Sequence, residues 1–215
     1  MTPCWPARLR PSSAILAAAL ALACARPAWA QSEAEILVAA MQDGGKVIYL
    51  RHGATNQNEV DTGRLGDRAG QRNLSAAGIA QARALGNAFR TLNIPMGEIL
   101  ASPVFRARDT AELAFGADRV EVTMDIVADD YAGPNLRAML QATTRLLRAF
   151  TPPGDNRILV GHRTPLERVL KRSFPDTLLP EGAMAVFLPN GVASEPKFLG
   201  TITAERFIRS ATVRR

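Results

Sequence analysis

Residues 47–53 read VIYLRHG, the most diagnostic stretch of the chain. Its first four residues are β-branched, aromatic or leucine, which predicts a buried strand that gives way to a loop near Gly53. Residues 158–163 read ILVGHR and repeat this arrangement. His52 and His162 are the only two histidines of the chain, and each ends an apolar run beside arginine and glycine. Because the charge of histidine changes near neutral pH, this placement favours a role in chemistry.

Strands alternate with helices along most of the chain. The patterns predict helices over 33–41, 75–92, 104–115, 135–150 and 165–172, and strands over 46–51, 98–101, 119–124, 157–161, 183–188 and 197–202. This alternation predicts an α/β fold, a three-layer α/β/α sandwich with a mostly parallel central sheet. Ligands of such sheets bind at the carboxyl ends of the strands. If the two histidine-bearing strands are neighbours, both imidazoles open onto one pocket.

The first 30 residues have the features of a secretory signal peptide. Arg8 and Arg10 precede an unbroken apolar run over residues 14–23, and residues 28–30 read AWA. The run is too short for a membrane span, so we expect cleavage after Ala30 and a periplasmic or secreted protein. The weaker alternative is a lipoprotein modified at Cys24.

Removal of this segment changes the composition. Both cysteines lie in it, so the mature chain has no thiol chemistry, no thiolate metal site and no disulfide. The formal charge of +6 falls to +3, because three arginines and no acid are lost. The remaining arginines are scattered among acids, which argues against a nucleic-acid partner. Residues 31–215 are expected to form a single domain without a large cap.

Arginines and acids accompany the two histidines at the predicted strand ends. A phosphoryl group carries negative charge on its equatorial oxygens, and arginine supplies planar donors that stay charged. A neutral imidazole can attack phosphorus directly, and a carboxylic acid can protonate the leaving alcohol. The residues that carry this interpretation are Arg51, His52, Asn58, Arg106, His162 and the acids near residue 130.

The motifs resemble those of the histidine phosphatase superfamily, also called the phosphoglycerate mutase-like family. The matching stretches are RHG with Thr55 and Asn58, LSAAG over 74–78, SP at 102–103 with Arg106, and GH at 161–162. They follow the family's order over roughly residues 46–190, each at a junction of strand and helix. The resemblance implies that His52 is the nucleophile and becomes phosphohistidine, and that Arg51, Arg106 and His162 form the phosphate pocket. It also implies that Asn58 orients the phosphate or the first loop, and that no metal or organic cofactor takes part.

The general acid is where the chain departs from the family pattern. Many relatives have a glutamate in an acidic, aromatic segment after the third strand, and here that region reads VADDYAG over 127–133. Asp130 or Asp129 is therefore the expected proton donor, with Glu181 as runner-up. The alternative is that these aspartates only cap the helix that begins near Asn135.

Three functions remain open from the sequence. The first is an exported phosphatase that hydrolyses a small-molecule phosphomonoester or a phosphorylated envelope component. The second is a phosphoglycerate-mutase-like phosphotransferase, which needs more enclosing loop than the short connections offer. The third is an envelope protein that binds a phosphate ligand with little turnover.

Overall fold

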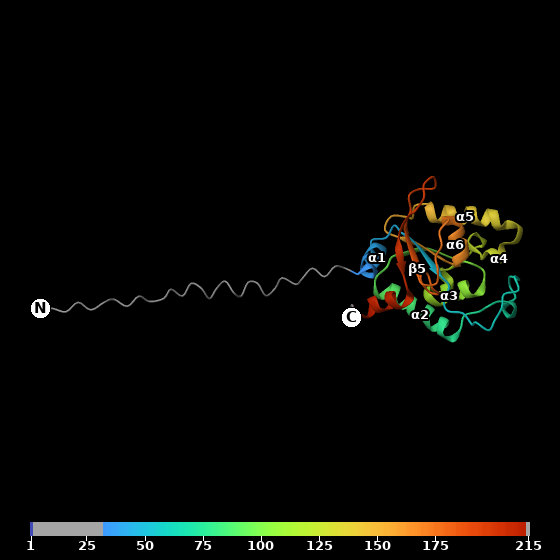
Figure 1. Ribbon diagram of the computed structural model, residues 1–215, viewed down its shortest axis with the longest axis horizontal. Helices are drawn as coiled ribbons and strands as arrows, with labels where there is room; N and C mark the ends of the chain where they lie inside the picture. The colour runs from blue at the N-terminus through green and yellow to red at the C-terminus, as the bar shows by residue number, and fades with distance from the viewer. Residues whose placement is uncertain (2–31, 214–215) are drawn as a thin grey trace. The chain divides into compact units, whose positions relative to one another are not determined.

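The computed structural model describes residue 1 and residues 32–213 (Figure 1). The predicted signal peptide and its cleavage site therefore lie outside the described residues. Within the described part, no helix is both long and apolar enough to cross a bilayer.

Helices and strands alternate from residue 33 to residue 213. The helices are α1 (Glu33–Gln42), α2 (Ala76–Thr91), α3 (Phe105–Phe115), α4 (Asp129–Ala132), α5 (Leu136–Arg148), α6 (Arg163–Leu170) and α7 (Ala204–Val213). The strands are β1 (Val47–Arg51), β2 (Met96–Ala101), β3 (Glu121–Val122), β4 (Asn156–Gly161), β5 (Met184–Leu188) and β6 (Lys197–Ile202).

The six strands form one sheet in the order β3-β2-β4-β1-β5-β6. The pairs among β1, β2, β3 and β4 are parallel, whereas β5 runs antiparallel to both β1 and β6. The last two strands therefore form an antiparallel pair. The sheet is mostly parallel, as the alternation of strands and helices predicted.

Both faces of the sheet are covered by helices. Ile48 and Leu50 pack in a cluster with residues of α1, α2, α3 and α7, whereas Val47 and Tyr49 pack on the opposite side with residues of α5 and α6. Figure 1 shows α5 and α6 across the sheet from α2 and α3. The fold is therefore the predicted three-layer sandwich, and it explains why every residue of β1 is buried.

Several elements differ from the sequence prediction. The strand expected over 119–124 shortens to residues 121–122 at the sheet edge, between 3-10 turns at 117–119 and 124–126. It pairs with β2 alone, so the exposed residues Glu121 and Val122 are bound to only one neighbouring strand. The loop prediction for 127–134 missed the single turn α4. Helix α7 was missed as well, although buried Phe207 and Ala211 have helical spacing.

A candidate active site at the carboxyl edge of the sheet

The two imidazoles converge at one edge of the sheet. Strands β1 and β4 are parallel neighbours, with Arg51 opposite Gly161, so that His52 and His162 leave the sheet side by side. The ring centroids lie 5.4 Å apart and the planes make an angle of 54°. Each residue is only 4% exposed. The conditional prediction that the imidazoles share one pocket is therefore confirmed.

The hydrogen bond of His52 determines which of its nitrogens is free. Its Nδ1 lies 2.9 Å from the carbonyl oxygen of Gly53, which can only accept, so Nδ1 carries the proton and Nε2 keeps its lone pair. Burial lowers the pKa of His52 well below its usual value, and the positive charges of Arg106, Arg51 and Arg72 lower it further. His52 thus presents a neutral nitrogen with a free lone pair at neutral pH.

Gly53 serves this arrangement through close packing and not through an unusual backbone conformation. Its φ is not in the positive range. Instead, a Cβ at this position would lie 3.2 Å from both the Gln81 side-chain oxygen and the Gly78 carbonyl oxygen. Gly53 therefore allows the backbone after His52 to pack closely against the first turn of α2.

His162 is held by Tyr49 and Ser102. The Tyr49 hydroxyl donates to the carbonyl oxygen of His162 at 2.8 Å. Gly161 leaves room for the Tyr49 hydroxyl, because a Cβ at residue 161 would lie 2.6 Å from the hydroxyl oxygen. The Ser102 hydroxyl accepts from the backbone N–H of Val104 and lies 2.8 Å from Nε2 of His162. If its own proton goes to Nε2, Nδ1 of His162 is a donor. This buried Nδ1 lacks a hydrogen-bond partner among the described residues.

Arg51 and Arg106 flank the imidazoles, and both are more than nine-tenths buried. Arg51 donates to the Leu179 carbonyl oxygen at 2.8 Å and pairs with Asp176, a carboxylate that also pairs with Arg163. Each guanidinium also has a buried Nε with no hydrogen-bond partner in the described part of the chain. Both arginines therefore bring a positive charge to the site, where it can attract an anion.

These side chains line one cavity of about 540 Å³. Its wall is rich in arginine and aspartate. The charged lining residues are Arg51, Arg72, Arg106, Arg163, Arg168, Asp61, Asp129 and Asp130. The cavity is large enough for a phosphoryl group together with part of an attached alcohol.

Asp130 is the predicted acid whose environment suits a proton donor. It lines the cavity from α4, and its pKa is raised above the usual value of an aspartate. Partial desolvation is the main cause, repulsion from Asp61 and Asp129 adds to it, and Arg106 opposes it. A raised pKa keeps more of the carboxyl protonated toward neutral pH, as a general acid requires.

The other two candidate acids are engaged as hydrogen-bond acceptors. Asp129 also lines the cavity, but its carboxylate accepts from Nε of Arg168 at 2.7 Å. Glu181 accepts from the backbone N–H and the hydroxyl of Thr55 at 3.0 and 2.8 Å, and the cavity lining does not include it. The helix α5 begins after Asn135 with no acid in its first turn, so neither aspartate caps it.

Asn58 does not lie where the sequence prediction put it. It is exposed, in the turn where its backbone N–H binds the Asn56 side chain, and the cavity lining does not include it. The neighbouring Glu59 binds Asn73 and holds this turn on the solvent side of the loop. The structure therefore does not bring Asn58 to the phosphate pocket.

Asp61 and Arg72 are cavity residues that sequence reasoning missed. One oxygen of Asp61 accepts from Arg106 at 2.9 Å, from the Tyr131 hydroxyl at 2.6 Å and from the backbone N–H of Arg72 at 3.0 Å. Arg72 lies within 3.8 Å of Glu181. Their loop is polar and rich in glycine throughout, so no local pattern marks these two residues. Asp61 links the loop, Arg106 and the acidic segment.

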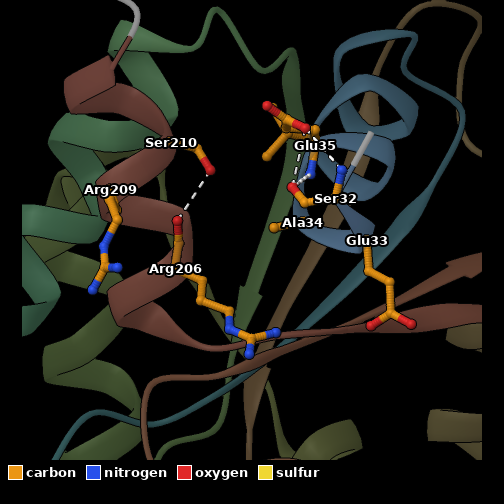
Figure 2. Close-up of a pocket in the computed structure, with 8 residues that line it drawn as sticks. Ser32, Glu33, Ala34, Glu35, Arg206, Arg209 and Ser210 are labelled. Atoms are coloured by element: carbon orange, nitrogen blue, oxygen red, sulfur yellow. Dashed lines mark hydrogen bonds between the residues drawn. The ribbon is translucent and has the colours of Figure 1, made fainter. Parts of the chain in front are cut away.

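A second cavity, of about 410 Å³, lies between α1 and α7 (Figure 2). Its lining includes Glu33 and Glu35 on α1, and Arg206 and Arg209 on α7. Glu35 is used by the capping box of α1 with Ser32. Neither imidazole lines this cavity, and the chemistry described above belongs to the first one.

The two buried imidazoles are expected to destabilise the protein as the pH falls below about 6.5, the ordinary pKa of histidine. Burial is the main cause that lowers both folded-state pKa values, and Arg106 adds to it, so the unfolded chain takes up protons first. Between the pKa of histidine in the unfolded chain and its pKa in the folded protein, each histidine lowers the free energy of unfolding by about 1.4 kcal/mol for every unit by which the pH falls. Carboxylates with a lowered pKa, such as Asp61, also stabilise the folded protein, and this contribution is lost only below about pH 4.

Urea unfolding at about pH 7.5 and about pH 5.5 measures this loss. We expect a His52→Gln/His162→Gln double variant to retain far more of its stability at the lower pH than the wild type does. An equal loss in both proteins would contradict the assignment.

The fold and the site define a class: a doubly covered α/β sheet with an oxyanion pocket at the carboxyl ends of its central strands. Residues 47–131 match the family model for the histidine phosphatase superfamily, branch 1. This segment contains Arg51, His52 and Arg106, so the similarity to the superfamily includes one of the two imidazoles and both buried arginines. A comparison with curated proteins found no match.

The chain is similar to several solved structures. The protein histidine phosphatase SixA complexed with tungstate has a TM-score of 0.50 at 19% identity, over 74% of this chain and 97% of that one. A putative phosphohistidine phosphatase SixA from Agrobacterium tumefaciens has a TM-score of 0.48 at 18% identity, over 74% and 98%. A phosphoserine phosphatase from Entamoeba histolytica, solved with phosphoserine, has a TM-score of 0.48 at 15% identity, over 75% and 98%.

Proposed function

We propose that this protein is an exported phosphatase that hydrolyses phosphomonoesters through a phosphohistidine on His52. The observation that carries the proposal is the hydrogen bond of His52, which determines which ring nitrogen holds the proton. Its Nδ1–H is committed to the Gly53 carbonyl, so a neutral Nε2 is left at a cavity that two buried arginines also line. Fixed cations beside a free nitrogen nucleophile are the requirements of in-line phosphoryl transfer.

The first half-reaction forms the phosphoenzyme. Nε2 of His52 attacks phosphorus in line with the ester oxygen, the N–P bond forms and the P–O ester bond breaks. Arg51, Arg106 and the Nδ1–H of His162 bind the phosphoryl oxygens, on which charge is concentrated. Asp130 gives its proton to the departing alkoxide, which leaves as the alcohol.

The second half-reaction regenerates the enzyme. A water molecule attacks the phosphorus of phosphohistidine, the N–P bond breaks and Asp130, now ionised, takes the proton of the water. Inorganic phosphate leaves and His52 returns to its neutral form. One carboxyl group therefore acts first as acid and then as base, which a raised pKa favours.

Access of water supports hydrolysis over transfer to a second hydroxyl group. Asp130, Thr164 and Arg168 line the cavity and are all exposed, so the wall that holds the proposed acid is open to solvent. A mutase must hold its phosphorylated product and re-orient it, which an open wall does not favour. The apolar run and the small residues around Ala30 support export of the chain.

One experiment tests turnover and export together. The protein is purified from the periplasmic fraction of producing cells, mixed with para-nitrophenyl phosphate and quenched in alkaline denaturant, because phosphohistidine is stable to base. Intact-mass measurement should show a chain that begins at Gln31 with a fraction carrying one phosphoryl group. A lipidated chain that begins at Cys24 would overturn the proposed cleavage site. An active enzyme with no phosphorylated fraction would overturn the phosphohistidine.

A further inference from the structure

An apolar groove adjoins the catalytic cavity between α5 and α6. It has a volume of about 370 Å³ and is lined by Leu136, Arg137, Leu140, Gln141 and Thr144 on α5 and by Arg168 and Val169 on α6. Leu136, Leu140 and Thr144 are four residues apart, so they share one stripe of the helix. The Thr144 hydroxyl already donates to the Leu140 carbonyl oxygen at 2.7 Å, so it needs no bond from a ligand. The groove contains no carboxylate in its lining.

The groove and the catalytic cavity have two wall residues in common. Leu136 and Arg168 line both. Arg168 is held at this boundary through the bond from its Nε to Asp129. A ligand that fills the cavity can therefore continue past Leu136 into the groove.

The position of Asp130 indicates which part of the substrate faces this boundary. A general acid must lie next to the ester oxygen that it protonates, and that oxygen leads to the leaving alcohol. Asp130 lines the cavity six residues before Leu136, within the same segment of the wall. The leaving group is thus expected on the side of the cavity where the groove begins.

We propose that this groove is the leaving-group subsite, and that it takes the apolar chain of an alkyl phosphomonoester. The inference rests on the proposed function, in which Asp130 protonates the leaving oxygen. The phosphoryl group stays with Arg51, His52 and Arg106, and the alkyl chain lies over Leu136 toward Leu140 and Val169. Removal of that chain from water is what favours binding.

Straight-chain alkyl phosphates from ethyl to octyl phosphate, below their micelle concentrations, test the subsite. Their alcohols are equally poor leaving groups, so a change in kcat/KM along the series reports contact with the chain and not chemistry. We expect kcat/KM to rise by about two- to threefold per added methylene until the groove is filled, as for partly buried methylene groups.

Variants inside and outside the groove separate the outcomes. In Val169→Thr, which keeps the side-chain shape, and in Leu140→Gln, the rise should flatten while ethyl phosphate is hydrolysed as by the wild type. Ile79→Gln is the control, because Ile79 is a partly exposed apolar residue on α2, which packs on the other face of the sheet. A flat wild-type series with active ethyl phosphate, or an unchanged slope in both groove variants, would overturn the subsite alone. No turnover of any ester would overturn the proposed function, and the subsite with it.

Discussion

Replacement of His52 by alanine is expected to lower kcat for phosphomonoesters by at least about ten-thousand-fold, the scale on which loss of a covalent nucleophile acts. The neutral Nε2 is the atom that forms the bond to phosphorus, and water at the same position is a far weaker nucleophile. The phosphorylated fraction seen by intact mass should disappear completely. Steady-state hydrolysis of para-nitrophenyl phosphate and the mass measurement check the two parts of this result.

His162→Gln is the matched control for this variant. His162 is buried beside His52 and is assigned to binding charge, so its loss should lower kcat by roughly a hundred- to a thousand-fold. It should still leave a phosphorylated enzyme. Unfolding in urea at neutral pH verifies that both variants are folded. Activity in His52→Ala equal to that of the wild type would rule out His52 as the nucleophile.

Asp130→Asn is expected to slow alkyl phosphates by about a hundred- to ten-thousand-fold. Para-nitrophenyl phosphate should lose less than about tenfold in the phosphorylation step, because nitrophenolate leaves without a proton. The wild-type kcat/KM for an alkyl phosphate should fall as the pH rises through the raised pKa of Asp130, since the acid is then ionised. This alkaline fall should be absent from the Asp130→Asn profile.

Asp129→Asn and Glu181→Gln test the same assignment by removing the two acids to which the role of proton donor is not assigned. Asp129 is paired with Arg168 and Glu181 accepts two hydrogen bonds from Thr55, so neither is placed to give a proton. Each substitution should therefore affect alkyl and nitrophenyl esters to a similar degree. A selective loss of alkyl ester hydrolysis in either variant, with Asp130→Asn unaffected, would move the role of acid to that residue.

The central strands and most helices were predictable because their signals are local. The apolar run of β1 is buried on both faces, and Ser75 caps α2 by accepting from the backbone N–H of Gly78. The edge strand β3 was predicted too long, because alternation of apolar and polar residues cannot show that only one neighbouring strand is present.

Sequence patterns located the imidazoles and the two buried arginines because each follows a strand or begins a helix in a recognisable motif. Asp61 was missed, although it binds Arg106 and Tyr131 in the cavity. Its position depends on a loop of about twenty residues, whose path is set by contacts with α3 and α4. Asn58, in the same loop, was placed in the pocket and lies at the surface instead.

The order of the strands and of the helices other than α4 and α7, and the arrival of His52 and His162 at strand ends, follow from the sequence by itself, because local periodicity indicates the type of each element. The environments of the three candidate acids were decided by the tertiary structure. Asp129, Asp130 and Glu181 have the same carboxyl group and differ in what surrounds it: an arginine, a partly desolvated cavity wall or the donors of Thr55. Those surroundings come from residues far apart along the chain, and they set whether a carboxyl can hold and release a proton.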